Sequence, residues 1–228
     1  IASPIPRSGL ILYYSFDKEG PSVKDASGSN HVGTVNGATW TPKGKIGGAY
    51  VCDVSGKYIS TPYDALFNFG STAFSLCLWV NPMSSSSQGA WLDRFSGPET
   101  SWLFWQEDQK MRFMAWTGKA NEYHSGDCLT ANAWQHVAVV RSGNTIAFYR
   151  NAAQVGQSAI TISINASTAP LWIGEHHNGS GFHAKASIDE VRIYNRALTL
   201  EEITALYKQT GPEARLSSPA TLPTETAL

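Results

Sequence analysis

The chain has 228 residues, of which 42% are hydrophobic and 15% charged, and its formal net charge is −1. One large all-β domain can account for this length, and the near-neutral charge argues against nucleic acid or an anionic membrane as a partner, because both need a clustered basic surface. No apolar run is long enough to span a membrane, and no signal peptide is recognisable. The three cysteines lack C-x-x-C spacing, which argues against a metal–thiolate site and leaves a disulfide plus one free thiol open.

Taken in chain order, the sequence begins with residues 1–8, which contain two prolines and are expected to form an extended arm. Residues 10–16 (LILYYSF) are almost entirely apolar, which is typical of a strand covered on both faces. A polar loop is expected from Asp17 to Asn30, with Asp25 among its turn residues. Further short strands are predicted near 31–35, 47–53, 57–60, 74–81, 91–95, 102–106, 111–116, 134–141, 146–149, 158–165 and 171–174.

Two segments carry the clearest patterns. Residues 74–81 (FSLCLWVN) alternate, with the Phe, both Leu and the Val on one side, which predicts a strand with one buried face. Residues 187–207 (SIDEVRIYNRALTLEEITALY) begin as a strand and continue with apolar residues at helical spacing. Thr199 stands three residues before Glu202, which is a capping box and predicts a short amphipathic helix after the strand. The Pro/Ser/Thr-rich residues 209–228 are predicted to be a linker or tail.

Many short strands separated by turn signals, with one helix at the end, predict an antiparallel sandwich. The segments that carry a resemblance are GLILYYSFD (9–17), DASGSNHVGTV (25–35), GKIGGAYVCDVSGKYIS (44–60), FSLCLWVNP (74–82), ANAWQHVAVVRSG (131–143), LWIGEHHNGSG (171–181) and IDEVRIYNRALTLEEITALY (188–207). In this order they resemble the laminin-G-like jelly rolls of the concanavalin A-like lectin/glucanase superfamily. The resemblance covers residues 9–208 and implies an all-β, two-sheet antiparallel jelly roll with one short C-terminal helix.

A calcium site is the first predicted site. If the first and last strands pair antiparallel, as in the family resembled, Asp17 and Asp189 lie close together on one rim, where two carboxylates repel unless one is protonated or a cation joins them. Ca²⁺ prefers oxygen ligands, and the loop of residues 25–31 offers Asn30 and backbone carbonyls. The resemblance also implies a structural Ca²⁺ where these strands meet. In the alternative reading, Asp17 only ends a strand and Asp189 pairs with Arg192.

A sugar-binding surface is the second predicted site, because aromatic rings stack on sugars while polar side chains bond their hydroxyls. The chain has eight Trp and nine Tyr, and four of the Trp lie within residues 91–116. Alternation would let Trp105, with Arg112 or Trp116, point out of a concave face, although about half of these four Trp are expected in the core. The predicted ligand-binding residues are Trp91, Arg94, Trp105, Trp116, Tyr123, His124, Glu175, His176 and His177.

Catalytic motifs are mostly absent. The E-x-D-x-(x)-E strand of the retaining glucanases of this superfamily does not occur, and neither do the strands of the jelly-roll alginate lyases. Asp189 and Glu190 are adjacent, so we expect them on opposite faces of their strand. A lyase site assembled from Arg94, Tyr123 and His176, with His124, stays open as an alternative.

We therefore expect a non-catalytic, lectin-like carbohydrate-binding module of an extracellular, polysaccharide-active protein. Its partner would be a polysaccharide or oligosaccharide, and its one cofactor a structural Ca²⁺. The alternatives are a polysaccharide lyase or glycoside hydrolase domain on the same jelly roll, and an adhesion module that binds protein. The linker-like tail favours a module of a larger secreted or cell-surface protein.

Overall fold

The computed structural model describes residues 5–95, 101–177 and 182–211. Its strands form two antiparallel sheets, and a single short α-helix follows the last strand. The strands are β1 (Leu10–Tyr14), β2 (Ser22–Val23), β3 (Gly33–Asn36), β4 (Thr39–Thr41), β5 (Ala49–Cys52), β6 (Tyr58–Thr61), β7 (Phe74–Pro82), β8 (Gly89–Asp93), β9 (Trp102–Glu107), β10 (Lys110–Trp116), β11 (Ala120–His124), β12 (Gln135–Ser142), β13 (Thr145–Arg150), β14 (Ala153–Ala159), β15 (Leu171–Ile173) and β16 (Ala186–Tyr194). The helices are the 3₁₀ helix η1 (Ala65–Phe67) and α1 (Leu200–Lys208).

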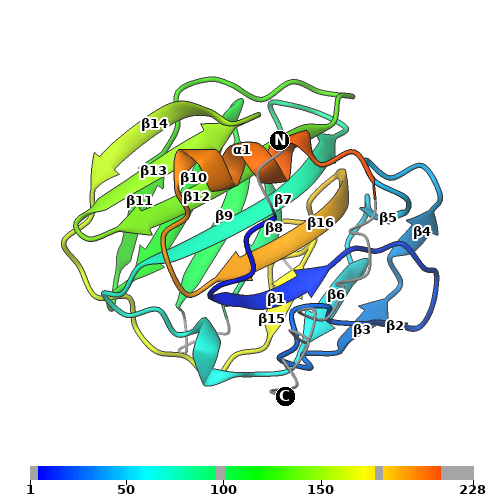
Figure 1. The fold of residues 1–228 in the computed structure, drawn as a ribbon, viewed down its shortest axis with the longest axis horizontal. Coiled ribbons are helices and arrows are strands. Elements are labelled where there is room, and N and C mark those ends of the chain that lie inside the picture. The colour runs from blue at the N-terminus through cyan, green and yellow to red at the C-terminus, as the bar shows by residue number, and fades with distance from the viewer. Residues whose placement is uncertain (1–4, 96–100, 178–181, 212–228) are drawn as a thin grey trace, which may run out of the picture.

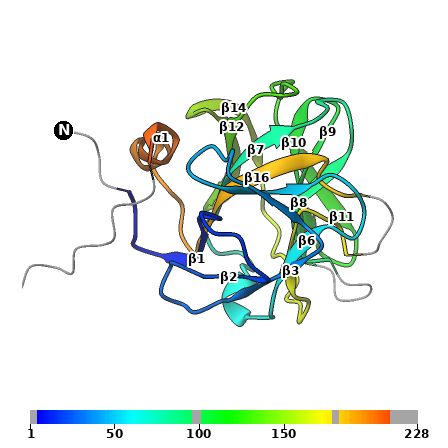
Figure 2. The ribbon, with the colours of Figure 1, turned by 90° about the vertical axis from the view of Figure 1, so that its right-hand side faces the viewer.

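Each sheet has eight strands. Sheet A has the order β14-β13-β12-β7-β16-β5-β4, with β1 also paired to β16, and sheet B has the order β11-β10-β9-β8-β15-β6-β3-β2. The first strand therefore lies beside the last one (Figure 1). Helix α1 covers the outer face of sheet A, and sheet B lies on the other side of sheet A (Figure 2). The prediction of an all-β, two-sheet antiparallel sandwich with one short helix is confirmed.

The alternation of side chains on β9 explains how sheet B buries one face in the core and carries aromatic residues on its other face as well. Trp102 and Phe104 point into the core between the sheets, whereas Leu103 and Trp105 belong to a separate cluster on the outer face of sheet B. Successive side chains of a strand point to opposite faces, so a strand of alternating large apolar residues supplies both layers. The same rule holds in β7, whose residue Leu78 faces the core as predicted.

Strand β16 contains a β-bulge that the sequence spacing reflects. Its pairing with β7 shifts register between Asp189 and Arg192, and Glu190 has a φ of 54°. A bulge inserts one extra residue into a strand. Ile188 and Val191 therefore both face the core although they are three residues apart.

Helix α1 begins with the predicted capping box. The Thr199 hydroxyl accepts a hydrogen bond from the backbone N–H of Glu202, and the Glu202 carboxylate accepts one from the N–H of Thr199 at 2.9 Å. Both groups would otherwise be unpaired at the helix start. Ile203 and Leu206 then pack on the outer face of sheet A, so the helix covers apolar surface that the sheet would expose. Neither described helix is long and apolar enough to cross a membrane.

Several strand predictions differ from the structure. Strands β2, β4 and β11 were not predicted, because their short, polar sequences carry little apolar alternation. A strand was predicted at 158–165, but β14 ends at Ala159, and Ile160 and Ile164 contribute to the core from an irregular segment. Edge strands such as β11 and β14 form through pairing with a neighbour, which a local pattern does not record.

The termini and the thiols also differ in part from expectation. Within the predicted N-terminal arm, Ile5 packs against the cluster below α1, and Pro6 accepts a hydrogen bond from the hydroxyl of Tyr194. Most of the predicted tail, residues 212–228, lies outside the described residues. The three cysteines, Cys52, Cys77 and Cys128, are free thiols in the structure.

The buried His136 on β12 makes the fold sensitive to acid. Burial, together with the smaller effect of the charge of Arg192, lowers the pKa of His136 to about 3. The unfolded chain, with a His pKa of about 6.5, takes up a proton below that pH whereas the folded chain does not. The contribution of the neutral His136 to the free energy of unfolding is therefore fully present above pH 6.5, and it is lost as the pH falls from about 6.5 towards 3.

We predict that lowering the pH from 7 to 5 costs the wild type about 2 kcal/mol more in unfolding free energy than a His136→Gln variant, which cannot take up the proton. Urea unfolding at the two pH values measures this difference. The matched control is His124→Gln, an exposed histidine whose removal keeps the wild-type dependence. An unchanged pH dependence in His136→Gln would contradict the prediction.

Candidate functional site

The outer face of sheet B carries a small apolar cluster that no other layer covers among the described residues. Ala90, Leu103, Trp105 and Met114 come from three neighbouring strands, β8, β9 and β10. Leu103, Trp105 and Met114 line an open hollow of ≈420 Å³ together with residues from the strand ends and from the segment before β16. The hollow is lined by Gln88, Phe95, Leu103, Trp105, Glu107, Met114, Glu122, His176 and Phe182.

The floor and the walls of the hollow differ in character. Trp105 is only 4% exposed and forms part of the floor, and its indole N–H has no hydrogen-bond partner. Phe95 and Phe182 are half-buried, and both pack edge-on against the His176 ring, with ring centroids 4.8 and 5.5 Å from it. A half-buried aromatic ring beside polar groups is the type of surface that small polar ligands use.

Arg112 on β10 lies between two acidic side chains of the hollow. Its guanidinium is 3.1 Å from the carboxylate of Glu107 on β9 and 3.4 Å from that of Glu122 on β11. Asp108, in the turn after β9, adds a third carboxylate at 3.9 Å. Gln88 donates its amide N–H to Glu107, which fixes the position of that carboxylate.

His176 is held by a buried carboxylate beneath it. The Asp93 carboxylate accepts hydrogen bonds from the ring Nδ1 of His176 at 2.9 Å and from the backbone N–H of His177 at 2.6 Å. Burial raises the pKa of Asp93, and the hydrogen bond from His176 opposes the rise. Nε2 is the ring nitrogen of His176 that Asp93 does not engage.

Of the nine predicted ligand-binding residues, the hollow brings together Trp105 and His176. Trp116 packs at its edge against Phe95, with ring centroids 5.9 Å apart. About half of the four tryptophans were expected to be buried, and the structure buries three: Trp91 and Trp102 lie between the sheets, and Trp105 is buried on the outer face of sheet B. The selection of Trp91 as a ligand residue was wrong, because its side chain is fully buried.

Two charged residues that were selected as ligand contacts are structural instead. Arg94 is fully buried and donates hydrogen bonds to the carbonyls of Ser167 and Ala169 at 2.6 and 2.9 Å. Burial lowers the pKa of Arg94 to about 10. Glu175 accepts hydrogen bonds from the hydroxyl of Ser55 and the backbone N–H of Gly56, both at 2.7 Å, so it ties a turn to the strand end.

The remaining three residues lie near the hollow but outside its lining. Tyr123 pairs with an inward-facing residue of β10 and packs against the core, on the face opposite to Glu122. His124 ends β11, and its ring contacts the carbonyl of Ser125 at 2.9 Å. His177 leans on Trp172, with ring centroids 4.4 Å apart.

The structure brings the two predicted metal-binding carboxylates to one loop. The carboxylate of Asp189 accepts a hydrogen bond from the backbone N–H of Ile46 at 2.9 Å, and the carboxylate of Asp17 lies against the neighbouring Gly47. One oxygen of each carboxylate is buried without a hydrogen-bond partner. Burial, with smaller contributions from the charges of Glu190 and Asp17, raises the pKa of Asp189 to about 8. Two buried unpaired oxygens and a destabilised negative charge are what an oxygen-binding cation would correct.

Asn30 does not join this pair. It is exposed, with a φ of 62°, in a loop that is anchored elsewhere. Glu190 lies near the pair but bonds to Tyr13 and Arg192. No group of three or more His, Cys, Asp or Glu side chains that could hold a metal is present in residues 5–95, 101–177 and 182–211, so further ligands at this place would be backbone carbonyls.

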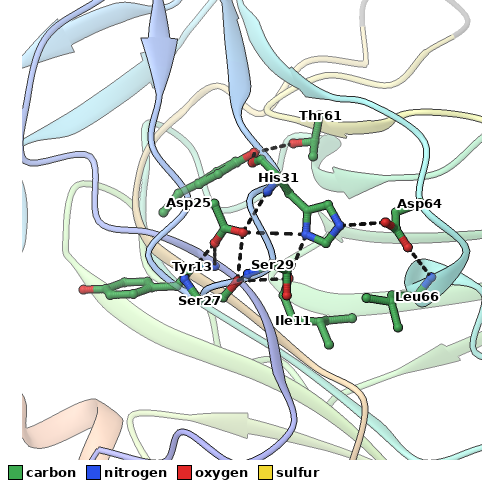
Figure 3. Close-up of polar contacts among 10 residues, drawn as sticks. Ile11, Tyr13, Asp25, Ser27, Ser29, His31, Thr61, Asp64 and Leu66 are labelled. Atoms are coloured by element: carbon green, nitrogen blue, oxygen red, sulfur yellow. Dashed lines mark hydrogen bonds and ion pairs between the residues drawn. The ribbon is translucent and has the colours of Figure 1, made fainter. Parts of the chain in front are cut away.

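The loop that carries Asn30 is anchored by Asp25 (Figure 3). The buried Asp25 carboxylate accepts hydrogen bonds from the backbone N–H groups of Tyr13, Ser27 and His31 at 2.9 to 3.0 Å. The ring of His31 in turn lies between the carbonyl of Ile11 at 2.9 Å and the carboxylate of Asp64 at 3.0 Å. These two oxygens only accept, so both contacts are hydrogen bonds when the ring carries both protons.

Sequence reasoning missed most of the lining of the hollow. Phe95, Phe182, Gln88 and Glu107 were not selected. The strand alternation that placed Trp105 on the outer face also places Glu107 there, two residues further on, so that residue could have been found. Phe182 and Gln88 lie in irregular segments, and no local pattern predicts where those segments pack.

Residues 53–204 match a laminin-G-type family described as the concanavalin A-like lectin/glucanases superfamily. The chain belongs to this superfamily. No curated protein matches the chain by sequence.

Several solved structures share the fold of the chain. The chain is similar to domain 4 of AbnA, a GH43 extracellular arabinanase from Geobacillus stearothermophilus in complex with arabinotriose, with 21% identity, a TM-score of 0.68 and coverage of 88% of this chain and 99% of that one. It is also similar to the binding domain of Paraclostridial Mosquitocidal Protein 1 (17% identity, TM-score 0.70, 88% and 52% coverage). A third is the botulinum neurotoxin serotype D ligand binding domain in complex with N-acetylneuraminic acid (14% identity, TM-score 0.70, 88% and 51% coverage). The chain thus spans about half the length of the two toxin domains.

We predict that Asp25→Ala lowers the unfolding free energy by about 3 kcal/mol, because three backbone N–H groups lose a buried charged acceptor. Urea unfolding measures the loss. The matched control is Asp53→Ala, which removes a partly exposed ion pair with Lys57 and should cost under about 1 kcal/mol. Equal losses in the two variants would contradict the anchoring role of Asp25.

Proposed function

We propose that the chain is a non-catalytic carbohydrate-binding module of an extracellular, polysaccharide-active protein, and that it binds its glycan in the hollow on sheet B. The observation that carries this proposal is the hollow itself, where aromatic walls from Phe95 and Phe182 stand beside hydrogen-bonding groups from Glu107, Glu122 and His176. A sugar presents apolar C–H faces and hydroxyl groups together, so it needs both kinds of partner in one place.

The comparisons support the class of ligand. The AbnA domain is similar to the chain over nearly all of its own length and was solved with arabinotriose, and the serotype D toxin domain was solved with N-acetylneuraminic acid. These sequence identities are low, so the choice of sugar and of binding surface rests on the residues of this chain.

The non-catalytic part of the proposal rests on the state of the charged groups. Both carboxylates of the hollow contact Arg112, whereas a glycosidase needs one carboxyl group that keeps its proton as an acid. A lyase needs a cation to neutralise the sugar carboxylate, but Arg94 is committed to carbonyls and Arg112 to carboxylates.

A polysaccharide lyase or hydrolase on the same fold is the second candidate, and one observation favours it. His176 is oriented by a buried carboxylate, an arrangement that many general bases use. Turnover of a polysaccharide that His176→Ala abolishes, with folding and glycan binding retained, would establish this candidate in place of the first. No described feature specifically favours the third alternative, a protein-binding adhesion module.

A structural Ca²⁺ belongs to the same proposal. Asp17 and Asp189 would hold it, with backbone carbonyls of the neighbouring loops completing the oxygen ligands. The two unpaired buried oxygens support this assignment. The ion would join the end of the first strand to the last strand and would stabilise the fold; the hollow lies on the other sheet, so the ion would not contact the glycan.

We predict that Phe182→Ala weakens glycan binding by about tenfold or more, because one apolar wall of the hollow is lost. Titration calorimetry with a panel of neutral oligosaccharides that includes arabinotriose measures the affinity, and assays for reducing ends and unsaturated products follow the same mixtures. The matched control is Tyr149→Ala, a half-buried aromatic residue on sheet A that should leave affinity unchanged. Cleavage of any oligosaccharide, or an equal loss in the control, would contradict the proposal.

We predict that saturating Ca²⁺ raises the Tm of the wild type by roughly 5–10 °C relative to EDTA, as expected for a ligand at about a hundred times its Kd. Asp17→Asn and Asp189→Asn should remove this response, because each removes a charged ligand. Asp127→Asn, which carries an exposed carboxylate paired with Lys110, should keep it. A wild-type Tm that is equal in Ca²⁺ and EDTA would refute the calcium assignment.

A further inference from the structure

We propose that the hollow on sheet B selects neutral or amino saccharides and rejects acidic ones, an inference that rests on the proposed function. It follows from the charge and the hydrogen-bonding direction of the groups around the hollow. Uronic and sialic acids carry a carboxylate, amino sugars carry an ammonium group, and neutral sugars carry hydroxyls that can donate. These three classes of sugar therefore need different charges and hydrogen-bonding groups in the hollow.

The first observation is charge. Around Arg112, the carboxylates of Glu107, Asp108 and Glu122 outnumber the single guanidinium. Lys110, the neighbouring cation on β10, is paired with Asp127 at 3.5 Å and leaves this balance unchanged. Four carboxylates and two cations give this side of the hollow a net charge of −2. The carboxylate of an acidic sugar would be a further negative charge here, and it would meet repulsion that the paired Arg112 does not offset.

The second observation is the direction of the hydrogen bonds. Ionised Glu107 and Glu122 only accept, and Nε2 of His176 accepts when the ring carries only the Nδ1 proton that it donates to Asp93. Gln88 donates one amide N–H to Glu107 and keeps its carbonyl oxygen as an acceptor beside a second N–H. The polar groups that line the hollow are therefore mostly acceptors, which suit the O–H donors of a neutral sugar or an ammonium group.

The third observation is a buried neutral donor. Trp105 lines the hollow, and its buried indole N–H has no hydrogen-bond partner in the described structure. An unpaired buried N–H is costly. A hydroxyl or ring oxygen of a sugar that reached this N–H would satisfy it, while the same sugar hydroxyl donates to a carboxylate. Neutral donors beside several acceptors match a hydroxyl-rich ligand, and a neutral N–H does not replace the cation that a carboxylate ligand needs.

Substitutions around Arg112 should change the preference for neutral over acidic sugars in opposite directions. In Glu107→Gln/Glu122→Gln, both close carboxylates become neutral and Arg112 keeps only Asp108 as an acidic neighbour at 3.9 Å. The freed guanidinium then favours acidic sugars. In Arg112→Gln the carboxylates stay and their counter-charge is lost, so the discrimination against acidic sugars grows.

The test uses matched ligands with one backbone linkage. Titration calorimetry compares cello-oligosaccharides, β-1,4-glucuronan oligosaccharides and chitosan oligosaccharides, and then manno-oligosaccharides against mannuronan oligosaccharides. We expect the wild type to bind the neutral or amino member of a set at least about tenfold more tightly than the acidic member, with a ratio that shrinks as salt is added. The double variant should bring this ratio to near unity or invert it, and Arg112→Gln should increase it.

The matched control is Glu201→Gln, which removes an exposed carboxylate in the first turn of α1, beyond sheet A, and should leave the ratio at its wild-type value. Acidic members that bind as tightly as neutral ones, or a ratio that the double variant does not change, would overturn the charge inference and leave the glycan-binding function standing. Failure of the wild type to bind any member, or any member of the neutral panel, would overturn the proposed function itself.

Discussion

The pairing of β16 on both of its edges is the constraint on which the rest of the structure depends. One edge of β16 pairs with β7, and the other pairs with β5 and then with β1, so the last strand joins the first and the middle of the chain. The bulge at Glu190 keeps Ile188 and Val191 in the core across this junction. It also leaves Asp189 beside the loop that contacts Asp17, so the fold concentrates negative charge where its ends meet.

The two faces of the sandwich are used differently for a physical reason. Helix α1 covers the outer face of sheet A and buries its apolar residues there. Sheet B has no such cover among the described residues, and its outer face combines a small apolar cluster with charged groups. A hollow that combines apolar and polar side chains is the usual form of a ligand site. This asymmetry is the reason why we propose the glycan site on sheet B.

The hydrogen bonds of buried polar groups distinguish residues that stabilise the fold from residues that can contact a ligand. Arg94 and Glu175 bond to backbone and hydroxyl groups inside the molecule, and these bonds hold irregular segments in place. His176 also has a buried partner, yet that partner engages only one of its ring nitrogens. His176 is therefore distinguished from Arg94 and Glu175 by its contacts and not by its residue type.

The sequence by itself determined the sandwich class, the strand–helix closure with its Thr199 capping box, and the outward direction of Trp105, because alternation and capping are local patterns. It also paired Asp17 with Asp189 through the resemblance. Only the tertiary structure decided that Trp91 and Arg94 are buried, that Asn30 is exposed, and that Phe182 lines the hollow. Those outcomes depend on which segments pack together across long sequence separations, and no local pattern records them.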